Sequence, residues 1–323
     1  MNPHPITEFY KPLPQGITQT PVSFMSDGLK IAGILYRPAG VQPGVRRPAV
    51  VVNGPASAVK EQAPAIYARN LVNSGYITLI FDHRNWGESE GMPRQEHDPQ
   101  GRVSDIKSAV SYLETRDDVD ADRIGVTGIC VGAGYAMAAA ATDPRITALA
   151  LVAGVYGWAR TNEASFGQEW MRSYLIEVNE HVAQQEQSGE TQHLTAVGPE
   201  GSTEPLASPS PDAYSYYGSP ERSYSPYWQN RFTWNSIAKM MSYDARPFAG
   251  LLSTPTIVVH GLTDPFTTPD MAREVYDHPR GPKKLELIEN KTHTSFYEGA
   301  PIGPACQAIA EWFDARHPEW SFS

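Results

Sequence analysis

The sequence predicts an α/β fold with a doubly wound, mostly parallel sheet and an inserted cap. From Pro48 to Ala153, short apolar runs alternate with segments of helical spacing. This alternation is typical of parallel strands joined by helical crossovers. The pattern breaks over about residues 158–252 and then returns. We therefore expect a core built from residues 1–157 and 253–323, with residues 158–252 inserted as the cap.

The core elements follow in chain order. Residues 20–37 are typical of an antiparallel hairpin that opens the sheet. Continuous apolar runs indicate strands buried on both faces, and they lie at residues 48–52, 76–81, 123–128 and 146–152. Residues 255–260 and 285–289 are predicted to be two more strands. Apolar residues spaced by three and four predict helices, at residues 63–71, 103–113 and 302–313.

The cap differs from the core in composition. Met171–Gln187 is predicted to be helical, whereas Gly198–Pro226 holds six prolines with many Ser and Gly and is predicted to be irregular. The cap is also rich in aromatic residues, which a flexible linker would lack. We expect it to cover the sheet edge, with four of these rings lining a substrate pocket: Trp158, Tyr217, Trp228 and Trp234. The alternative is that such rings form the core of the cap itself.

Composition excludes several classes of protein. The 323 residues are 41% hydrophobic, and 36 acidic against 26 basic residues argue against a nucleic-acid or anionic-membrane surface. Two cysteines are too few for a disulfide framework and match no zinc pattern. Met1–His4 does not look like the start of a signal peptide, and the longest apolar run, Ile146–Ala159, is shorter than the roughly 20 residues that span a bilayer. We expect a cytoplasmic protein and leave a homodimer open.

The sharpest chemical signal is Gly128-Ile129-Cys130-Val131-Gly132, which follows a predicted strand and precedes an Ala-rich helix. This pattern is the nucleophile elbow, in which the central residue sits on a strained strand-to-helix turn. Glycine flanks it because a Cβ at either position would clash with the neighbouring backbone. A helix N-terminus and a nearby imidazole both stabilise a thiolate, so Cys130 is the predicted nucleophile. The alternative is a small buried Cys in a tight turn.

A cysteine nucleophile needs a base and a group that orients the base. In the hydrolase chain order both follow the nucleophile at the ends of later strands. Asp264 and His293 lie where this order requires them, and we predict that they are the acid and the base. Asp270 and Asp244 are the fallback acids.

An oxyanion hole needs two backbone N–H donors. Val131, which follows the nucleophile, is one candidate. The other comes from the loop Asn53-Gly54-Pro55-Ala56-Ser57, where Pro55 has no N–H to offer. Ala56 is the predicted donor, and Gly54 is the reserve.

Two further polar motifs look chemical but are better explained as structure. Asp82–Ser89 is predicted to be a tight turn in which Asp82 accepts from backbone N–H groups. Glu96-His97-Asp98 resembles a metal cluster but is predicted to be a solvated turn. No glycine fingerprint, phosphate loop or zinc motif is present, so we expect neither cofactor nor metal. Cys306 falls on the apolar stripe of the last helix and is predicted to lie in the core.

These features together resemble the α/β-hydrolase superfamily, in particular its dienelactone-hydrolase-like members, which also carry Cys in the elbow, and their YcjY-like branch. The motifs that carry the resemblance are Val59–Gln62, Phe81–Arg84 with Gly91–Gln95, Asp122–Gly125, Ala213–Tyr217 and Asn230–Trp234. The resemblance implies an eight-stranded sheet and a Cys130–His293–Asp264 triad. Dienelactone hydrolase itself places a Glu after the third strand, where this chain has Asn53, and this difference argues against a dienelactone substrate.

Three functions are compatible with these residues. The first is hydrolysis of an ester, lactone or thioester through an acyl-cysteine, acting on a small acyl substrate. The second is acyl transfer or cyclisation on the same triad, with a nucleophile other than water, as in polyketide-type metabolism. The third is a ligand-binding protein with a vestigial site, against which the intact Cys, Asp and His argue.

Overall fold

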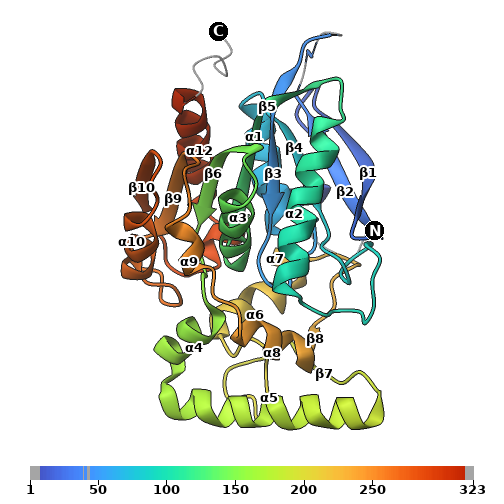
Figure 1. The fold of residues 1–323 in the computed structure, drawn as a ribbon, viewed down its shortest axis with the longest axis vertical. Coiled ribbons are helices and arrows are strands. Elements are labelled where there is room, and N and C mark those ends of the chain that lie inside the picture. The colour runs from blue at the N-terminus through green and yellow to red at the C-terminus, as the bar shows by residue number, and fades with distance from the viewer. Residues whose placement is uncertain (1–7, 39, 42–43, 317–323) are drawn as a thin grey trace.

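The computed structural model describes residues 8–38, 40–41 and 44–316; Met1–His4 lies outside this part of the chain (Figure 1). Its centre is a mixed, mostly parallel sheet of eight strands in the order β1-β2-β4-β3-β5-β6-β9-β10, typical of an α/β-hydrolase. β2 runs antiparallel to both neighbours, and the remaining adjacent pairs are parallel. The strands are β1 (Thr18–Ser26), β2 (Leu29–Arg37), β3 (Arg47–Asn53), β4 (Ile77–Phe81), β5 (Val119–Ile129), β6 (Ile146–Val152), β9 (Thr256–Gly261) and β10 (Lys283–Ile288).

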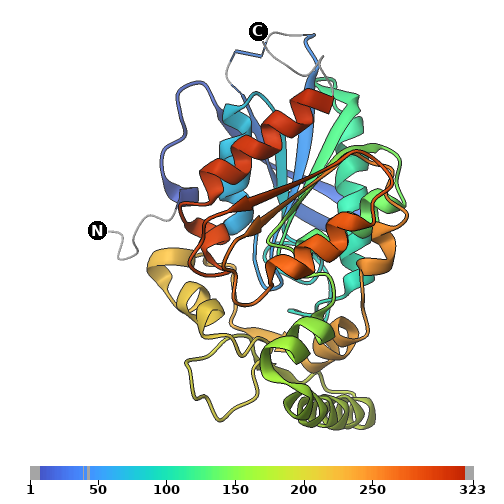
Figure 2. The same cartoon turned by 90° about the vertical axis from the view of Figure 1, so that its left-hand side faces the viewer.

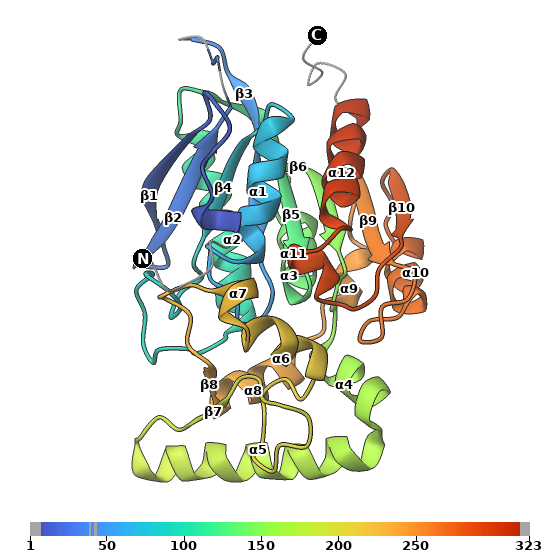
Figure 3. The same cartoon turned by 180° about the vertical axis from the view of Figure 1, so that it is seen from behind.

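Helices cover both faces of this sheet. One face packs against α1 (Ala63–Asn73) and α12 (Ile302–Arg316), as Figure 3 shows. The other carries α2 (Pro99–Glu114), α3 (Val131–Ala141), α9 (Arg246–Ala249) and α10 (Pro269–Asp277). The central strands β3, β4 and β6 are almost wholly buried, since they lie between two helical layers. The fold class and the predicted core strands are confirmed, with ends that shift by up to four residues.

The inserted segment lies beyond one end of the sheet (Figures 1 and 2). It contains α4 (Trp158–Phe166), the long α5 (Gln168–Ser188), β7 (His193–Thr195), α6 (Pro211–Tyr217), α7 (Pro220–Ser223), β8 (Arg231–Thr233) and α8 (Trp234–Met241). Part of the stretch predicted to be irregular is therefore helical. Pro211 and Pro220 each occupy the first turn of a short helix. At this position a backbone N–H would have no partner within the helix, so proline loses nothing by lacking one, and its fixed φ suits the helix.

Within the described residues, no helix is long and apolar enough to cross a membrane.

Candidate active site

Cys130 occupies a strained turn between β5 and α3. Its φ of 58° and ψ of −126° lie in a region that residues with a side chain seldom adopt. Glycine on both sides makes the turn feasible: a Cβ on Gly128 would lie 2.4 Å from the Gly132 carbonyl oxygen, and one on Gly132 would lie 2.5 Å from that of Gly54. The sulfur is thus held over the end of the sheet, where it lines a pocket.

His293 and Asp264 meet at the same edge of the sheet. His293 Nδ1 lies 2.7 Å from Asp264 Oδ2, and both side chains are buried. The other carboxylate oxygen accepts from the N–H groups of Phe266 and Thr267 at 2.9 and 3.0 Å. Because the Asp264 carboxylate accepts a hydrogen bond from Nδ1, that nitrogen carries a proton, and Nε2 is the nitrogen left to interact with Cys130.

The electrostatics of this pair favour the charged forms. Burial by itself raises the pKa of Asp264, but the paired His293 and the Thr267 N–H outweigh it and lower the pKa to about 2. Burial by itself lowers the pKa of His293, but Asp264 and Cys130 outweigh it and hold the pKa well above its ordinary value. The imidazole is therefore a strong proton acceptor beside the thiol.

Two buried side chains face the Cys130 thiol. No other described nitrogen or oxygen atom bonds His293 Nε2, and its remaining interaction is with Cys130. Tyr297, on α11 (Ser295–Glu298), lines the same pocket as Cys130, and its ring packs edge-on against His293 with centroids 5.5 Å apart. Burial and then the nearby thiol hold the pKa of Tyr297 well above its usual range, so the phenol stays protonated. The sequence offered no motif that singled out Tyr297.

Both predicted oxyanion donors belong to elements that border the thiol. Val131 is the first residue of α3, where N–H groups have no partner within the helix. Ala56 lines the same pocket, in the loop after β3. Asn53, at the end of β3, donates to the Gly132 carbonyl at 2.8 Å and so ties this loop to the elbow.

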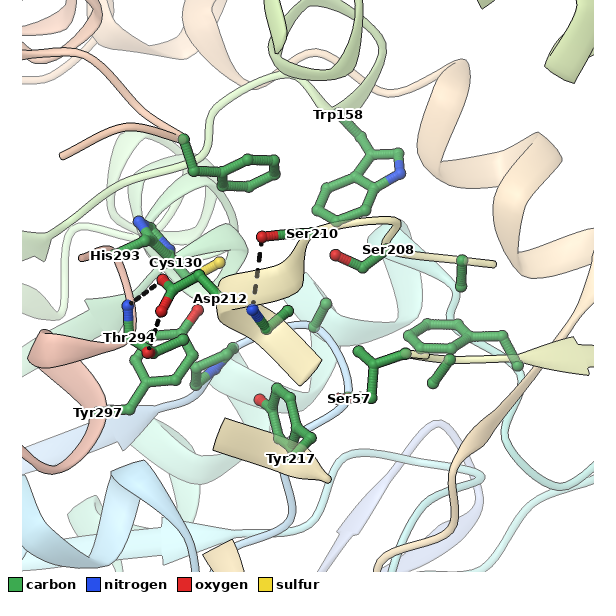
Figure 4. A pocket seen from close by; sticks show the side chains of 18 of the residues that line it. Ser57, Cys130, Trp158, Ser208, Ser210, Asp212, Tyr217, His293, Thr294 and Tyr297 are labelled. Carbon is green, nitrogen blue, oxygen red and sulfur yellow. Dashed lines mark hydrogen bonds between the residues drawn. The ribbon is translucent and has the colours of Figure 1, made fainter. Parts of the chain in front are cut away.

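The pocket beside Cys130 encloses about 560 Å³ of space, its mouth included. Trp158 and Tyr217 stand on opposite sides of it, and Cys130, His293 and Tyr297 gather at one end (Figure 4). Phe232, Ile237, Met240 and Phe266 add apolar wall, and Ser57, Ser208 and Ser210 add hydroxyl groups. Of the four rings predicted to line the pocket, Trp158 and Tyr217 do so.

Two of the four rings predicted to line the pocket are not among the described residues that do so. Trp228 stacks behind Tyr217, with ring centroids 5.4 Å apart. Trp234 stacks on His181 with centroids 4.1 Å apart, which joins α8 to α5. Both rings are used to build the cap, because a segment of little regular structure needs large apolar side chains to pack.

Asp212 joins the cap to the loop that carries the base. Its carboxylate accepts from the Thr294 N–H at 2.9 Å and from the Thr294 hydroxyl at 2.7 Å, next to His293 (Figure 4). Asp212 also lines the pocket. The cap thereby fixes the residue that follows the base.

The remaining polar motifs have structural roles. Asp82 forms the predicted turn, accepting from the N–H groups of Lys60 and Glu88 at 2.8 and 2.9 Å. The prediction of a solvated turn at Glu96-His97-Asp98 is wrong: His97 is fully buried, and Asp98 caps the N-terminus of α2. In the described chain, no group of three or more His, Cys, Asp or Glu side chains could hold a metal ion.

In the described part of the chain, the two fallback acids pair with arginines and not with His293. Asp270 is exposed and pairs with Arg273 at 2.9 Å, and Asp244 pairs with Arg246 at 2.6 Å. His260 is buried, with Nε2 at 2.7 Å from the Thr267 carbonyl, so it supports the Asp264 turn.

Comparison with known proteins places the chain in a family. The model of the X-Pro dipeptidyl-peptidase family, S15, matches residues 27–295. The chain belongs to the S15 family. This S15 member thus has the α/β-hydrolase fold that its motifs predicted, while the likeness to dienelactone hydrolases stays a prediction.

Three known proteins are similar to this chain over nearly their whole length. The uncharacterized protein YcjY of Escherichia coli is 28% identical over 296 residues, covering 88% of this chain and 94% of its own, which confirms the expected likeness. The crystal structure of hypothetical protein PA2218 from Pseudomonas aeruginosa superposes with a TM-score of 0.81 at 26% identity, covering 97% of this chain and 99% of that one. The thiohydrolase aneE of Aspergillus aculeatus is 27% identical over 305 residues, or 91% of each chain.

Proposed function

We propose that this S15-family chain is a cysteine-dependent acyl hydrolase that acts on thioesters and activated esters. One observation carries the proposal: Cys130 sits at positive φ on the elbow, in the same pocket as His293, whose Nδ1 lies 2.7 Å from Asp264 Oδ2. A nucleophile, a base and a group that orients the base are the parts that acyl transfer to a side chain requires. The similarity to a protein named thiohydrolase points to the same chemistry.

The proposed reaction has two halves. His293 takes the proton of the Cys130 thiol, the sulfur attacks the substrate carbonyl carbon, and the carbonyl oxygen becomes an oxyanion that accepts from the N–H groups of Val131 and Ala56. The bond to the leaving thiolate then breaks, and His293 returns the proton to it. In the second half, water attacks the acyl-Cys130 carbonyl as His293 takes its proton, and the carboxylic acid and the Cys130 thiolate are released.

The leaving group decides which substrates react. A thiolate or an aryl oxide departs at least as well as Cys130, so the tetrahedral intermediate collapses forward. An alkoxide departs less readily, so the same intermediate from an ethyl ester expels Cys130 again. The aromatic rings Trp158, Tyr217 and Phe266 in the wall favour bulky aryl or long acyl groups over acetyl.

The test compares three benzoyl donors of matched acyl group: the N-acetylcysteamine thioester, the p-nitrophenyl ester and the ethyl ester. We expect rapid release of the thiol and the phenol, with a benzoyl adduct on Cys130 in the intact mass spectrum, and slow reaction of the ethyl ester. An acyl-enzyme that survives in water but discharges to an added amine or alcohol would assign the chain to acyl transfer instead.

The two cysteines supply a matched pair of variants. Cys130→Ala should leave less than about a hundredth of the turnover, since a triad acts as a unit. Cys306→Ala should keep both turnover and adduct, because that thiol is buried in α12, outside the pocket. Fast hydrolysis of ethyl benzoate without an adduct, or an active Cys130→Ala protein, would overturn the proposal.

A further inference from the structure

His97 is a buried histidine directly behind the wall of the active-site pocket. It lies between β4 and α2 and is fully shielded from solvent. Its ring stacks on Phe232 of the cap, with centroids 6.0 Å apart, and its backbone N–H donates to Ser236 Oγ at 2.8 Å. Three parts of the molecule hold the His97 imidazole in place: the cap through Phe232, the loop after β3 through Ala56, and helix α3 through Tyr135.

The hydrogen bonds assign the tautomer of the His97 ring. Nδ1 lies 3.1 Å from the Ala56 carbonyl oxygen, which can only accept, so Nδ1 carries the proton. Nε2 lies 2.7 Å from the Tyr135 hydroxyl, which donates to it when the ring is neutral. Burial, with the cationic Arg102 and then His83 nearby, lowers the pKa of His97 well below its ordinary value, in agreement with a neutral ring. Burial likewise raises the pKa of Tyr135, so its hydroxyl keeps the proton that it donates.

The two partners of His97 belong to the two halves of the oxyanion hole. Ala56 and Ser57 line the pocket in the loop after β3. Tyr135 lies on α3, the helix whose first residue, Val131, offers the other donor. A trans peptide is planar, with its carbonyl and N–H on opposite sides. A hydrogen bond to the Ala56 carbonyl therefore sets the direction of the Ser57 N–H and the position of the loop.

We propose that His97 is the positioning residue of the oxyanion hole, joining the Ala56–Ser57 peptide to α3 so that donors from both elements keep one fixed spacing. The inference rests on the proposed acyl chemistry and deepens it. It also adds the Ser57 N–H to Ala56 as a candidate donor. His97 touches no reacting atom, and it acts through the loop that it holds.

Two substitutions separate the two ends of the ring. The amide nitrogen of asparagine falls near the place of Nδ1, so His97→Asn keeps a donor for the Ala56 carbonyl and loses Tyr135. The amide of glutamine reaches the place of Nε2, so His97→Gln keeps a contact with Tyr135 and releases Ala56. If the Ala56 bond is what matters, His97→Asn rescues the function and His97→Gln does not.

Two reactions of the same thiol supply the readout. Acylation of Cys130 by benzoyl N-acetylcysteamine thioester passes through an oxyanion, whereas alkylation by iodoacetamide does not. In His97→Gln we expect acylation to fall by about 10- to 100-fold, approaching the loss of one oxyanion-hole donor. We expect alkylation within about twofold of wild type, since the thiol, His293 and Asp264 are unchanged. In His97→Asn, acylation should stay within about fivefold of wild type.

Tyr135→Phe provides a second route that preserves the volume of the core. It removes the hydroxyl that donates to Nε2 and leaves the Ala56 bond, as His97→Asn does, so we expect acylation within about fivefold of wild type, with alkylation unchanged. A wild-type acylation rate in His97→Gln, or an equal fall of acylation and alkylation in every variant, would overturn the positioning role. Absence of any acyl-Cys130 in the wild-type protein would overturn the proposed function itself, and this role with it.

Discussion

Replacing Asp264 by asparagine tests the orienting acid with almost no change of shape. Oδ1 accepts from Phe266 and Thr267 at 2.9 and 3.0 Å, and an amide oxygen there would keep both bonds. Oδ2, which pairs with His293 Nδ1 at 2.7 Å, becomes an amide nitrogen that only donates. His293 then has to present a lone pair at Nδ1, so that Nε2 holds the proton and cannot take one from Cys130.

The size of the effect follows from the bond that is lost. A hydrogen bond to a charged group contributes about 1.5–3 kcal/mol, and about 1.36 kcal/mol corresponds to a tenfold change in rate. Acylation should therefore fall by about 10- to 150-fold from this contact alone. The same exchange costs about 10⁴-fold in a serine triad through the wrong tautomer. We expect the smaller range here, because a thiol loses its proton more easily than a hydroxyl does.

The assay is the rate of benzoyl transfer to Cys130 from the thioester at pH 7, with Asp270→Asn as the matched control. Asp270 belongs to the same segment after β9 but is 89% exposed at its side chain, where it pairs with Arg273. We expect Asp270→Asn to react as wild type does. Acylation in Asp264→Asn at the wild-type rate, or an equal loss in the control, would refute the assignment of Asp264.

Three further predictions address the thiol and its turn. The raised pKa of His293 means that its imidazole is protonated at pH 6, and the positive charge of the imidazolium favours the Cys130 thiolate. His293→Ala should therefore slow alkylation of Cys130 at pH 6 by at least about tenfold, and an unchanged rate would contradict the role of His293. Tyr297→Phe removes a hydroxyl that can donate to the Cys130 thiolate, so alkylation at pH 6 should slow by about three- to tenfold, and a faster rate would exclude Tyr297 as a donor. Gly128→Ala places a Cβ at 2.4 Å from a backbone oxygen and should cost about 3 kcal/mol or more of unfolding free energy. Gly303→Ala, with nothing within 4 Å, should change it by about 1 kcal/mol at most, and urea denaturation that finds equal losses would contradict the steric argument.

The core could be predicted because its signals are local and strong. The apolar run 146–152, in which Thr147 is the single polar residue, is β6 to the residue, since a strand buried on both faces is apolar along nearly its whole length. The elbow was visible because its glycines and cysteine stand together in the sequence, although only Gly128 is required by local contacts, and Gly132 is required by the backbone of Gly54. The chain order of Asp264 and His293 followed from the strands that precede them.

The rest of the site depends on contacts between residues distant in the sequence. His97 lies 41 residues from Ala56 and 38 from Tyr135, and nothing in Glu96-His97-Asp98 indicates that the histidine turns inward. Aromatic content predicted that the cap packs, but not which rings face inward: Tyr217 reaches the pocket, while Trp234 stacks on His181 instead. Composition indicates how much apolar surface the cap must bury, but it does not indicate which side chains face the pocket.

The cap contacts the loop that carries His293, and this contact bears on specificity. The core supplies Cys130 and His293, but Asp212 of the cap bonds both the N–H and the hydroxyl of Thr294, the residue after the base. A movement of α6 that widens the pocket also pulls on this loop. Because a misplacement of about 1 Å can cost about 100-fold in rate, we expect a change in the cap that admits a larger acyl group to alter the rate as well as the affinity. We therefore expect substrate choice and catalytic rate to be coupled in this protein through Asp212.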